Sequence, residues 1–334
     1  MGFEASVLRR ATRRLKEQRE RRAAEAQRRR TKIYESIPQA AEIDRRLQST
    51  VAQAVSAALR QGTDPAPAIA ALREENLTLQ ARRRDLLVQH GWPPDALDDG
   101  PACPKCRDSG WVGANMCTCL RELCTQEQIQ ELSKLLDLGE HSFDRFSLDY
   151  YSPNPWPGEN LSPRENMTFI YEVCLNYARR FGKFPFKNLF LTGAPGLGKT
   201  FLSACIARTV SEQGVSVVYD TAVNIFAQFE EQKFSRDRLD AEGARDETRR
   251  YLGCDLLILD DLGSELTTPF VQSALYTLLN ARLMANKRTV ISSNLSMDEV
   301  RRRYTGQIAS RLEGEYRVLI FFGEDIRLLR KARL

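Results

Sequence analysis

The chain has 334 residues, of which 42% are hydrophobic and 28% are charged, and its formal net charge is +5. This length allows two domains that each bury a core, and the composition excludes a fibrous or fully disordered protein. No apolar run approaches the roughly 18–20 residues of a membrane span, and no signal-peptide pattern precedes the body of the chain. The opening MGFEAS fits a loose myristoylation pattern, which we discount because a charged helical segment follows it. We therefore expect a cytoplasmic protein.

Positive charge is concentrated at the N-terminus. Residues 1–32 carry twelve Arg or Lys residues against four Glu residues, a net charge of +8, so the remaining residues carry −3. This basic arm has almost no large apolar residue after Leu15, which predicts a helix that needs a partner for stability. Such an arm can attract nucleic acid or an acidic protein surface. It can equally be a solvated helix face with Glu/Arg pairs at helical spacing.

Two helices are predicted next, separated by the turn QGTDPAP at 61–67. Apolar residues repeat at helical spacing on both sides of that turn. They are Ile43, Leu47, Val51, Val55 and Leu59, followed by Ile69, Leu72, Leu79, Leu86 and Leu87. The pattern is typical of a helical hairpin. Together with the cysteine-rich segment that follows, it predicts a small helical, metal-binding N-terminal domain over residues 33–130.

The segment CPKCRDSGWVGANMCTCL (103–120) holds four cysteines in two close pairs. Their clustering in a chain of this size favours reduced thiols over a disulfide scaffold. A C-x₂-C pair and a C-x-C pair suit tetrahedral Zn²⁺, and the predicted ligands are Cys103, Cys106, Cys117 and Cys119. Because C-x-C is tight, Cys124 is a plausible substitute for one of the second pair. An iron–sulfur cluster lacks a third widely spaced motif, and a redox dithiol would be expected near a βαβ unit.

Residues 131–165 are rich in aromatic residues and proline and are predicted to be a linker. Over residues 166–334, short apolar runs alternate with helical segments. The predicted strands are KNLFLTG (187–193), VSVVYD (215–220), DLLILDD (255–261), RTVISSN (288–294) and RVLIFFG (317–323). Near-continuous apolar strands alternating with helices indicate an α/β domain with a five-stranded parallel sheet covered on both faces.

The sequence GAPGLGKT at 193–200 matches the phosphate-binding pattern G-x-x-x-x-G-K-[ST] between a predicted strand and a predicted helix. Its glycines let the backbone wrap a phosphate and point amide N–H groups at it. We expect Lys199 to reach the β- and γ-phosphates of ATP and Thr200 to ligate Mg²⁺. The predicted nucleotide-binding residues are Gly193, Ala194, Pro195, Gly196, Leu197, Gly198, Lys199, Thr200 and Phe201.

Two acids end the predicted strand in LLILDDLG (256–263). Adjacent carboxylates repel each other unless a cation lies there. We therefore expect Asp260 to help hold Mg²⁺ and Asp261 to orient or deprotonate an attacking water. Nucleotides lie beyond the carboxyl ends of parallel strands, where Asn294 could contact the γ-phosphate or the water. Alternatively, Asn294 caps the helix that follows it.

The segments over about 143–327 resemble the AAA+ ATPases, and more narrowly the DnaC/DnaI-like bacterial helicase loaders with their IstB-like relatives. The resemblance is carried by FDRFSLDYY, SPRENM, NLFLTGAPGLGKTFLSACIA, LLILDDLG, SSNLS and SRLEGEYR. The cysteine segment extends it, because loaders of this type from Gram-positive bacteria carry a zinc-bearing N-terminal domain. The resemblance implies an AAA+ P-loop NTPase fold. Few residues follow Phe322, so the C-terminal lid would be very short, as in the loader branch.

The resemblance also assigns roles by position. Judged from the residues alone, Arg311 and Arg327 could each bind phosphate as a bidentate cation. Each could equally be solvated or salt-bridged. By resemblance, Asn294 is the sensor-1 residue and Arg327 the sensor-2 arginine acting in cis. Arg311 looks like an arginine finger that reaches the nucleotide of a neighbouring subunit. A finger in trans implies ATP-linked self-association.

The function implied by the resemblance is that of an ATPase that binds the hexameric replicative DNA helicase. It would help to place that helicase on single-stranded DNA during replication initiation or restart, and its N-terminal domain would grip the helicase. Arg301–Arg303 with Tyr304 are candidate contacts to the single strand, with a solvated helix face as the alternative.

Two other functions stay open. The first is an IstB-like transposition helper ATPase that acts on duplex DNA with a transposase. The cysteine segment argues against it, because those relatives resemble this chain only in the ATPase part. The second is a nucleotide-gated adaptor that does not hydrolyse ATP.

Overall fold

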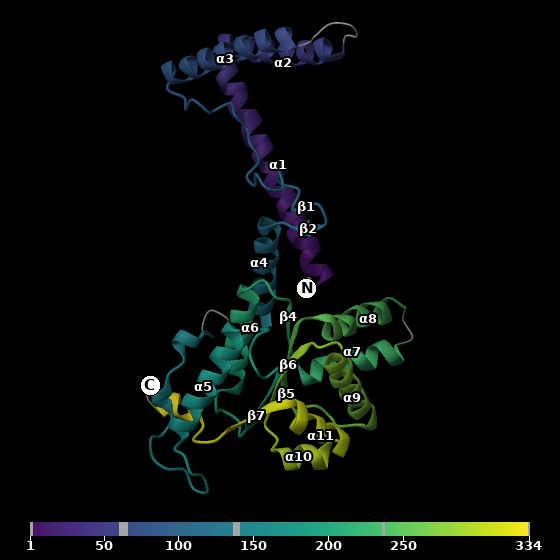
Figure 1. Ribbon diagram of the computed structural model, residues 1–334. Helices are drawn as coiled ribbons and strands as arrows, with labels where there is room; N and C mark the ends of the chain where they lie inside the picture. The colour runs from purple at the N-terminus through teal and green to yellow at the C-terminus, as the bar shows by residue number, and fades with distance from the viewer. Residues whose placement is uncertain (1–2, 60–65, 136–140, 236–237, 333–334) are drawn as a thin grey trace. The chain divides into compact units, whose positions relative to one another are not determined.

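The structure is a computed structural model that describes residues 3–59, 66–135, 141–235 and 238–332 (Figure 1). The chain divides into two compact units, each of which is described by itself. One consists of Met1–Ala11 with Arg121–Leu334, and the other is Thr12–Leu120. This division differs from the domain boundaries expected after residues 32, 130 and 165. None of the described helices is both long enough and apolar enough to cross a membrane.

The first unit is built on five parallel strands in the order β4-β5-β6-β3-β7. The strands are β3 (Asn188–Gly193), β4 (Val217–Thr221), β5 (Leu256–Leu262), β6 (Arg288–Ser293) and β7 (Tyr316–Phe321). Each coincides with one of the five apolar runs, so the predicted α/β fold with a five-stranded parallel sheet is confirmed. β3, which carries the phosphate loop, lies between β6 and β7, so that the loop is flanked by strands on both sides.

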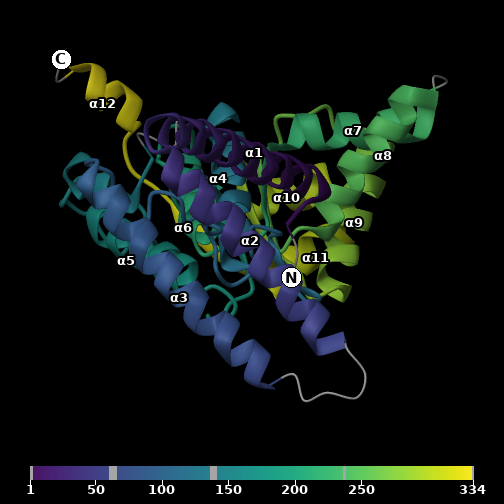
Figure 2. The same cartoon turned by 90° about the horizontal axis from the view of Figure 1, so that it is seen from above.

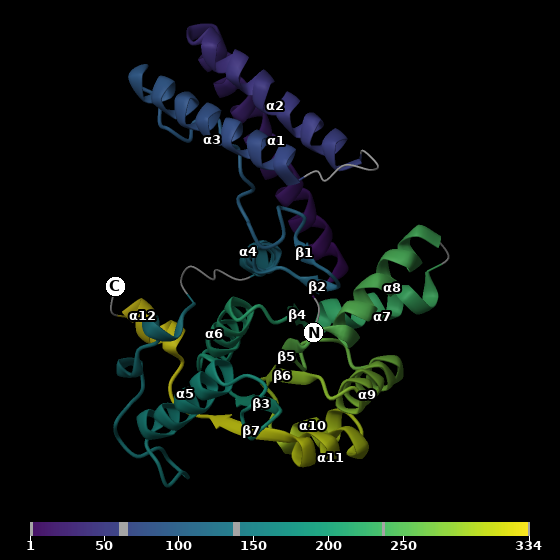
Figure 3. The ribbon, with the colours of Figure 1, turned by 45° about the horizontal axis from the view of Figure 1, so that its top comes forward.

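Helices cover both faces of this sheet (Figures 1 and 3). They are α5 (Pro163–Arg179), α6 (Lys199–Glu212), α7 (Ala222–Phe234), α8 (Arg238–Gly253), α9 (Pro269–Met284), α10 (Met297–Arg303) and α11 (Gly306–Glu315). Alternate residues of β5 enter different cores. Leu256 and Ile258 pack with α5 and α6, whereas Leu257 and Leu259 pack with helices α7 to α11. Burial on both faces explains the continuous apolar runs.

Much of the expected linker is part of this unit. It contains the 3₁₀ helices Phe143–Arg145 and Leu148–Tyr150. Phe143 and Tyr151 are buried in the core that α5 and α6 form with the sheet. Leu132, in the last turn of the preceding helix, joins the same core. The segment before α5 therefore packs into the core of the first unit.

Helix α4 (Thr118–Leu135) is anchored to the sheet through its second half. The buried amide of Gln128 donates to the carbonyl of Val215 at 2.7 Å. One turn further on, Glu131 pairs with Arg250 of α8 at 2.7 Å. These contacts tie the helix to the residues just before β4 and to α8.

The second unit holds helices, the first of them from Thr12 onward, and a small β-hairpin. Its elements are α1 (Ala5–Ser36), α2 (Pro38–Leu59), α3 (Ala66–Gln89), β1 (Trp111–Val112) and β2 (Asn115–Met116). The expected helical hairpin is present, because α2 and α3 lie side by side (Figure 2). They are joined by an ion pair between Arg46 and Glu75 at 2.8 Å and by a hydrogen bond from Thr50 to Asn76.

The apolar stripe of the hairpin is only partly buried where it is described, since Ile69 is exposed and Leu47, Leu72 and Leu86 are half-buried. Ile43, Leu79 and Leu87 are all buried. The side chains of Val51, Val55 and Leu59 and the turn at 60–65 lie outside the described residues. Helix α1 continues without a break past the boundary expected after residue 32, and Ile33 at its end is fully buried.

Candidate functional site

The predicted phosphate loop connects the end of β3 to the start of α6. Gly193 and Gly198 have positive φ values of 147° and 91°. A Cβ atom on Gly193 would lie 2.2 Å from the carbonyl oxygen of Phe321, and one on Gly198 would lie 2.8 Å from the hydroxyl of Tyr151. Only glycine fits at these positions. The loop thus lies tightly between two neighbours, at a helix N-terminus that favours anions.

The side chain of Lys199 folds back over this loop and is 7% exposed. Its Nζ donates to the carbonyls of Gly193 and Ala194, each at 2.7 Å. Burial lowers the pKa of Lys199 to about 8, and the charges of Asp261 and Asp260 oppose this shift. A bound phosphate would therefore stabilise the charged form of a lysine that burial disfavours.

Asp260 lies near the carboxyl end of β5 and is 6% exposed. Its carboxylate accepts hydrogen bonds from the hydroxyls of Thr200, at 3.2 Å, of Tyr219 and of Ser292. The two predicted magnesium ligands, Thr200 and Asp260, are thus in contact, and their hard oxygen donors suit Mg²⁺. Sequence reasoning missed Tyr219 and Ser292. The available signal was a polar side chain near the end of each strand that flanks β5.

Asp261 makes a different set of contacts. Its φ of 58° lies in the left-handed region, and its carboxylate accepts from the amide of Asn294 at 2.8 Å. The alternative role of Asn294 as a helix cap is wrong, because Ser296 caps α10. The structure therefore places a half-buried acid beside an exposed amide at the mouth of the site. Such a pair can hold and polarise a water molecule.

Arg311 is held against its own chain. Its guanidinium donates to the side-chain oxygen of Asn280 and, at 3.1 Å, to the hydroxyl of Tyr276, and it lies 4.6 Å above the ring of Tyr276. Both partners belong to α9. The role of Arg311 as an arginine finger that reaches the nucleotide of a neighbouring subunit stays a prediction.

Arg327 lies in the terminal helix α12 (Ile326–Ala332), which begins at the phosphate loop. The N–H of Ile326 donates to the carbonyl of Gly196 at 3.0 Å. A Cβ atom on Gly196 would lie 2.1 Å from a carboxylate oxygen of Asp325. The short C-terminal segment thus lies against the loop, as a lid would, and the sensor-2 role of Arg327 stays a prediction.

The candidate contacts to single-stranded DNA are only partly on the surface. Tyr304 is 5% exposed and its hydroxyl donates to the carboxylate of Glu265. Arg303 donates to Thr267 and to the carbonyl of Glu265, each at 2.7 Å. The expected contact of Tyr304 with the single strand is wrong, because this ring is buried and, together with Arg303, holds the loop after β5. Arg301 and Arg302 remain exposed.

The four predicted zinc ligands converge in the second unit. The sulfur atoms of Cys103, Cys106, Cys117 and Cys119 all lie within 4.8 Å of one another. The distances are 3.6 Å between Cys103 and Cys117 and 3.4 Å between Cys106 and Cys119. They exceed a disulfide bond of about 2.05 Å and approach the roughly 3.8 Å that separates thiolates in a tetrahedral zinc site. Cys124 is not one of the four, so no substitution is needed.

The loop that carries the first two cysteines is shaped for this convergence. The carboxylate of Asp108 accepts from the N–H of Cys103 at 2.9 Å and pairs with Arg22 at 3.1 Å. The N–H of Gly110 is directed at the sulfur of Cys106 at 3.4 Å. Fixed sulfur positions with N–H groups pointing at them fit a structural zinc ion bound by four thiolates.

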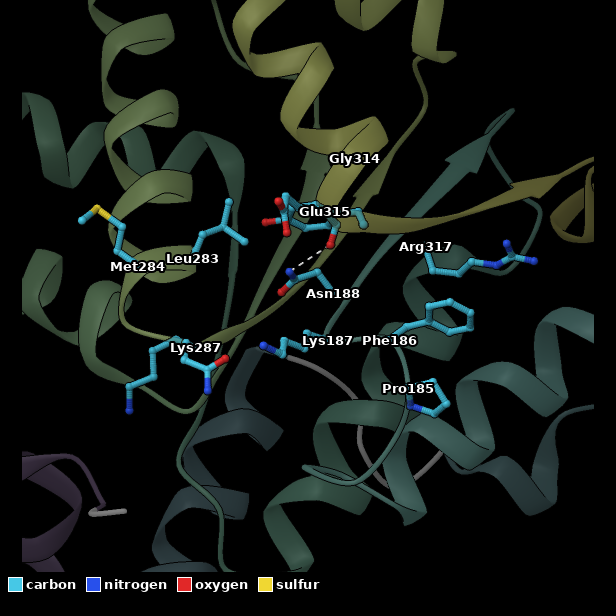
Figure 4. A pocket seen from close by; sticks show the side chains of 12 residues that line it. Pro185, Phe186, Lys187, Asn188, Leu283, Met284, Lys287, Gly314, Glu315 and Arg317 are labelled. Atoms are coloured by element: carbon cyan, nitrogen blue, oxygen red, sulfur yellow. Dashed lines mark hydrogen bonds between the residues drawn. The ribbon is translucent and has the colours of Figure 1, made fainter.

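A cavity of about 600 Å³ lies at the opposite end of the strands (Figure 4). Its lining includes Asn188 and Arg317, at the starts of β3 and β7, and Met284 at the end of α9. Figure 4 shows the amide of Asn188 donating to the carbonyl of Glu315, at 3.1 Å. The cavity is therefore separate from the phosphate loop.

The strand order identifies the class of the first unit. The phosphate-loop strand lies between β6 and β7, and the acid pair is on β5, on the far side of β6. This is the sheet of the AAA+ class of P-loop proteins. Residues 185–311 match the model of a family described as IstB-like ATP binding protein. Residues 185–311 are thus similar to an IstB-like ATP-binding domain, and the chain resembles the DnaC/DnaI-like proteins.

The chain is also similar to two replication proteins. The chain is 29% identical over 120 residues to the replicative helicase loader DnaI of Bacillus subtilis, covering 36% of this chain and 37% of that protein. It is 29% identical over 135 residues to the chromosomal replication initiator DnaA of Wolinella succinogenes, covering 40% of this chain and 29% of that one. The matches span about a third of the length of these relatives.

The chain is also similar to solved structures. A crystal structure of the DnaC helicase loader is 18% identical, with a TM-score of 0.42, covering 54% of this chain and 98% of that one. A crystal structure of DnaI is 21% identical, with a TM-score of 0.42, covering 57% and 93%.

The cysteine cluster predicts a zinc content that depends on its four residues. The wild-type protein should retain about one zinc ion per chain after gel filtration. Cys103→Ser should lose most of it, because a site with three thiolates binds zinc less tightly. Cys124→Ser, which removes a buried thiol outside the cluster, should retain it. Elemental analysis by mass spectrometry measures the content, and equal losses in both variants would contradict the assignment.

The lowered pKa of Lys199 predicts a pH dependence of nucleotide affinity. Below about pH 7 the free protein already carries the charge, whereas above pH 8 nucleotide binding must take up a proton. The affinity for ADP should therefore fall about tenfold between pH 7 and pH 9. Titrations at constant ionic strength measure it. Lys199→Arg stays charged and should show a much flatter profile; an equally steep one would assign the titration to another group.

Proposed function

We propose that this protein is an ATP-hydrolysing loader that binds the replicative DNA helicase and helps to place it on single-stranded DNA. The observation that carries the proposal is the phosphate loop joined to a buried acid, through Thr200 and Asp260, in a domain of the IstB-like ATP-binding family. The similarity to a protein named as a replicative helicase loader supports the choice of partner. Replication initiation or restart in the cytoplasm is the corresponding setting.

In the proposed ATP hydrolysis, different residues of the site bind the phosphates, hold the metal ion and activate the water. The loop amides and Lys199 bind the phosphates, and Thr200 with Asp260 would hold Mg²⁺, whose charge offsets the charge that develops on the phosphates. Asp261 and Asn294, which are hydrogen-bonded to each other at 2.8 Å, orient a water molecule for attack. Asp261 accepts its proton.

Two arginines would extend the site, one within the same chain and one toward a neighbouring chain. Arg327 begins α12 beside the phosphate loop and would contact the nucleotide of its own chain. Arg311 would leave Asn280 and Tyr276 to reach the nucleotide of the next chain, so that ATP promotes self-association. In this scheme the N-terminal residues, with their helical hairpin and zinc-binding cysteines, grip the helicase, while nucleotide state controls assembly and the hold on DNA.

An IstB-like transposition helper that acts on duplex DNA is the second candidate. One observation favours it, namely that the matching family model bears the IstB description. The cysteine cluster and the similarity to DnaI favour the loader.

The catalytic assignment predicts that Asp261→Asn loses hydrolysis but keeps ATP binding. The turnover number should fall at least about a hundredfold, because an amide cannot accept the proton of the water. Asp255→Asn is the matched control, since Asp255 lies just before β5, at its other end, where it pairs with Lys287 at 2.8 Å. Phosphate release and nucleotide binding measure the two steps. Turnover by Asp261→Asn close to the wild-type rate would favour a different base or a non-catalytic adaptor.

The loader assignment predicts capture of the replicative helicase from the same organism. The full-length protein on a support should retain purified helicase, and Cys103→Ser should retain much less if the zinc-binding unit makes the contact. Electron microscopy with duplex DNA tests the second candidate. If filaments form on duplex DNA and no helicase is retained in any nucleotide state, the loader assignment is wrong and the transposition helper is favoured.

A further inference from the structure

The peptide group between Leu197 and Gly198 in the phosphate loop is held from outside the loop. The hydroxyl of Tyr151 donates to the carbonyl of Leu197 at 3.0 Å. The side chains of Tyr151 and Leu197 are 3% and 1% exposed, in the core shared with α5 and α6. The same hydroxyl lies 2.8 Å from the position of a Cβ atom on Gly198. A residue more than forty positions earlier in the chain therefore touches the loop backbone.

This contact determines the direction of one loop amide. In a trans peptide group the C=O and the N–H point in opposite directions. A bond that draws the carbonyl of Leu197 toward Tyr151 turns the N–H of Gly198 away from it. Tyr151 lies on the core side of the loop, so this N–H faces the side on which phosphate is bound at the start of α6.

The loop itself offers little resistance to rotation of that peptide group. Gly196 and Gly198 flank Leu197 and both have positive φ, at 80° and 91°. Glycine adopts φ values of either sign at similar cost. After a rotation by half a turn, the carbonyl oxygen would face the phosphates in place of the N–H. An acceptor at that position repels an anion, so the rotated loop is a poor phosphate site.

Tyr151 is itself firmly placed. Its N–H donates to the carbonyl of Leu148 at 3.0 Å, and its carbonyl accepts from Nε of Arg164 at 3.0 Å. Its ring stacks on Phe146 with 5.9 Å between centroids. Burial raises the pKa of Tyr151, so the hydroxyl remains a donor at neutral and mildly alkaline pH.

We propose that Tyr151 is a positioning residue for nucleotide binding: its hydroxyl holds the Leu197–Gly198 peptide group in the orientation that directs the N–H of Gly198 at the phosphates. The inference rests on the proposed nucleotide site, and it extends that site to the segment before α5. The hydroxyl makes no contact with the nucleotide. It acts by keeping the binding-competent loop populated before the nucleotide arrives.

Pre-organisation and a lost contact have different kinetic signatures. If Tyr151→Phe lets the loop rotate, only the competent fraction of the molecules can bind, and the apparent affinity falls by that fraction. The association rate constant should then fall about tenfold, a factor that matches the loss of one buried hydrogen bond. The dissociation rate constant should stay within about twofold, because the bound loop is held by the phosphates.

Stopped-flow fluorescence with ATP and ADP labelled on the ribose measures both rate constants on the full-length protein. Tyr171→Phe is the matched control, because Tyr171 lies in the same aromatic cluster and its hydroxyl donates to the carbonyl of Phe143 at 3.2 Å. This variant should bind nucleotide at the wild-type rate. Thermal unfolding without nucleotide reports any general loss of packing in either variant.

The outcomes separate the inference from the function on which it rests. Slower association in Tyr151→Phe alone, with unchanged dissociation, supports the positioning role. Unchanged kinetics in Tyr151→Phe, or an effect confined to dissociation, overturns it while leaving the nucleotide site intact. Equal slowing in Tyr171→Phe also overturns it, because general packing would then be the cause. Absence of nucleotide binding by the wild-type protein would refute the proposed function itself.

Discussion

The site is organised around one buried carboxylate. Asp260 accepts three hydroxyl hydrogen bonds, which come from α6, β4 and β6. A buried acid is costly unless donors surround it, so these three elements must meet at this position for the fold to tolerate the charge. The proposed role of Asp260 as a cation ligand and the need to satisfy its hydrogen bonds therefore involve the same oxygen atoms. Sheet geometry and site geometry constrain each other here.

The phosphate loop is likewise shaped from outside. Phe321 of β7 and Tyr151 press against its glycines, and the N–H of Ile326 binds the carbonyl of Gly196. These contacts come from segments on both sides of the loop in the sequence. A flexible glycine-rich loop thus gains a defined shape from its neighbours. The segment before α5 and the short terminal helix both contact the loop and limit the positions that its backbone can take.

Local patterns predicted the strands, the phosphate loop and the acid pair, because burial on two faces and turn chemistry act over a few neighbouring residues. The contacts of Tyr219, Ser292 and Tyr151 depend on packing between distant segments. Polar side chains near the ends of the strands that flank β5 were a signal for Tyr219 and Ser292, but no local pattern marks Tyr151. For Tyr304 the opposite happened, because a local pattern predicted a surface contact that the structure does not have. An aromatic residue after three arginines suggested an exposed surface, but the carboxylate of Glu265 lies within reach of its hydroxyl only in the folded chain.

Asp261 carries a conformational cost that follows from its place. A non-glycine residue at a φ of 58° is disfavoured by about 1 kcal/mol or more, although aspartate and asparagine tolerate this region better than most residues. The backbone at the proposed general base is therefore less stable than it would be with glycine. Selection for thermal stability alone would favour glycine at this position, and the glycine variant would be inactive. A random screen for stabilised variants of this domain therefore needs a hydrolysis assay at the same time.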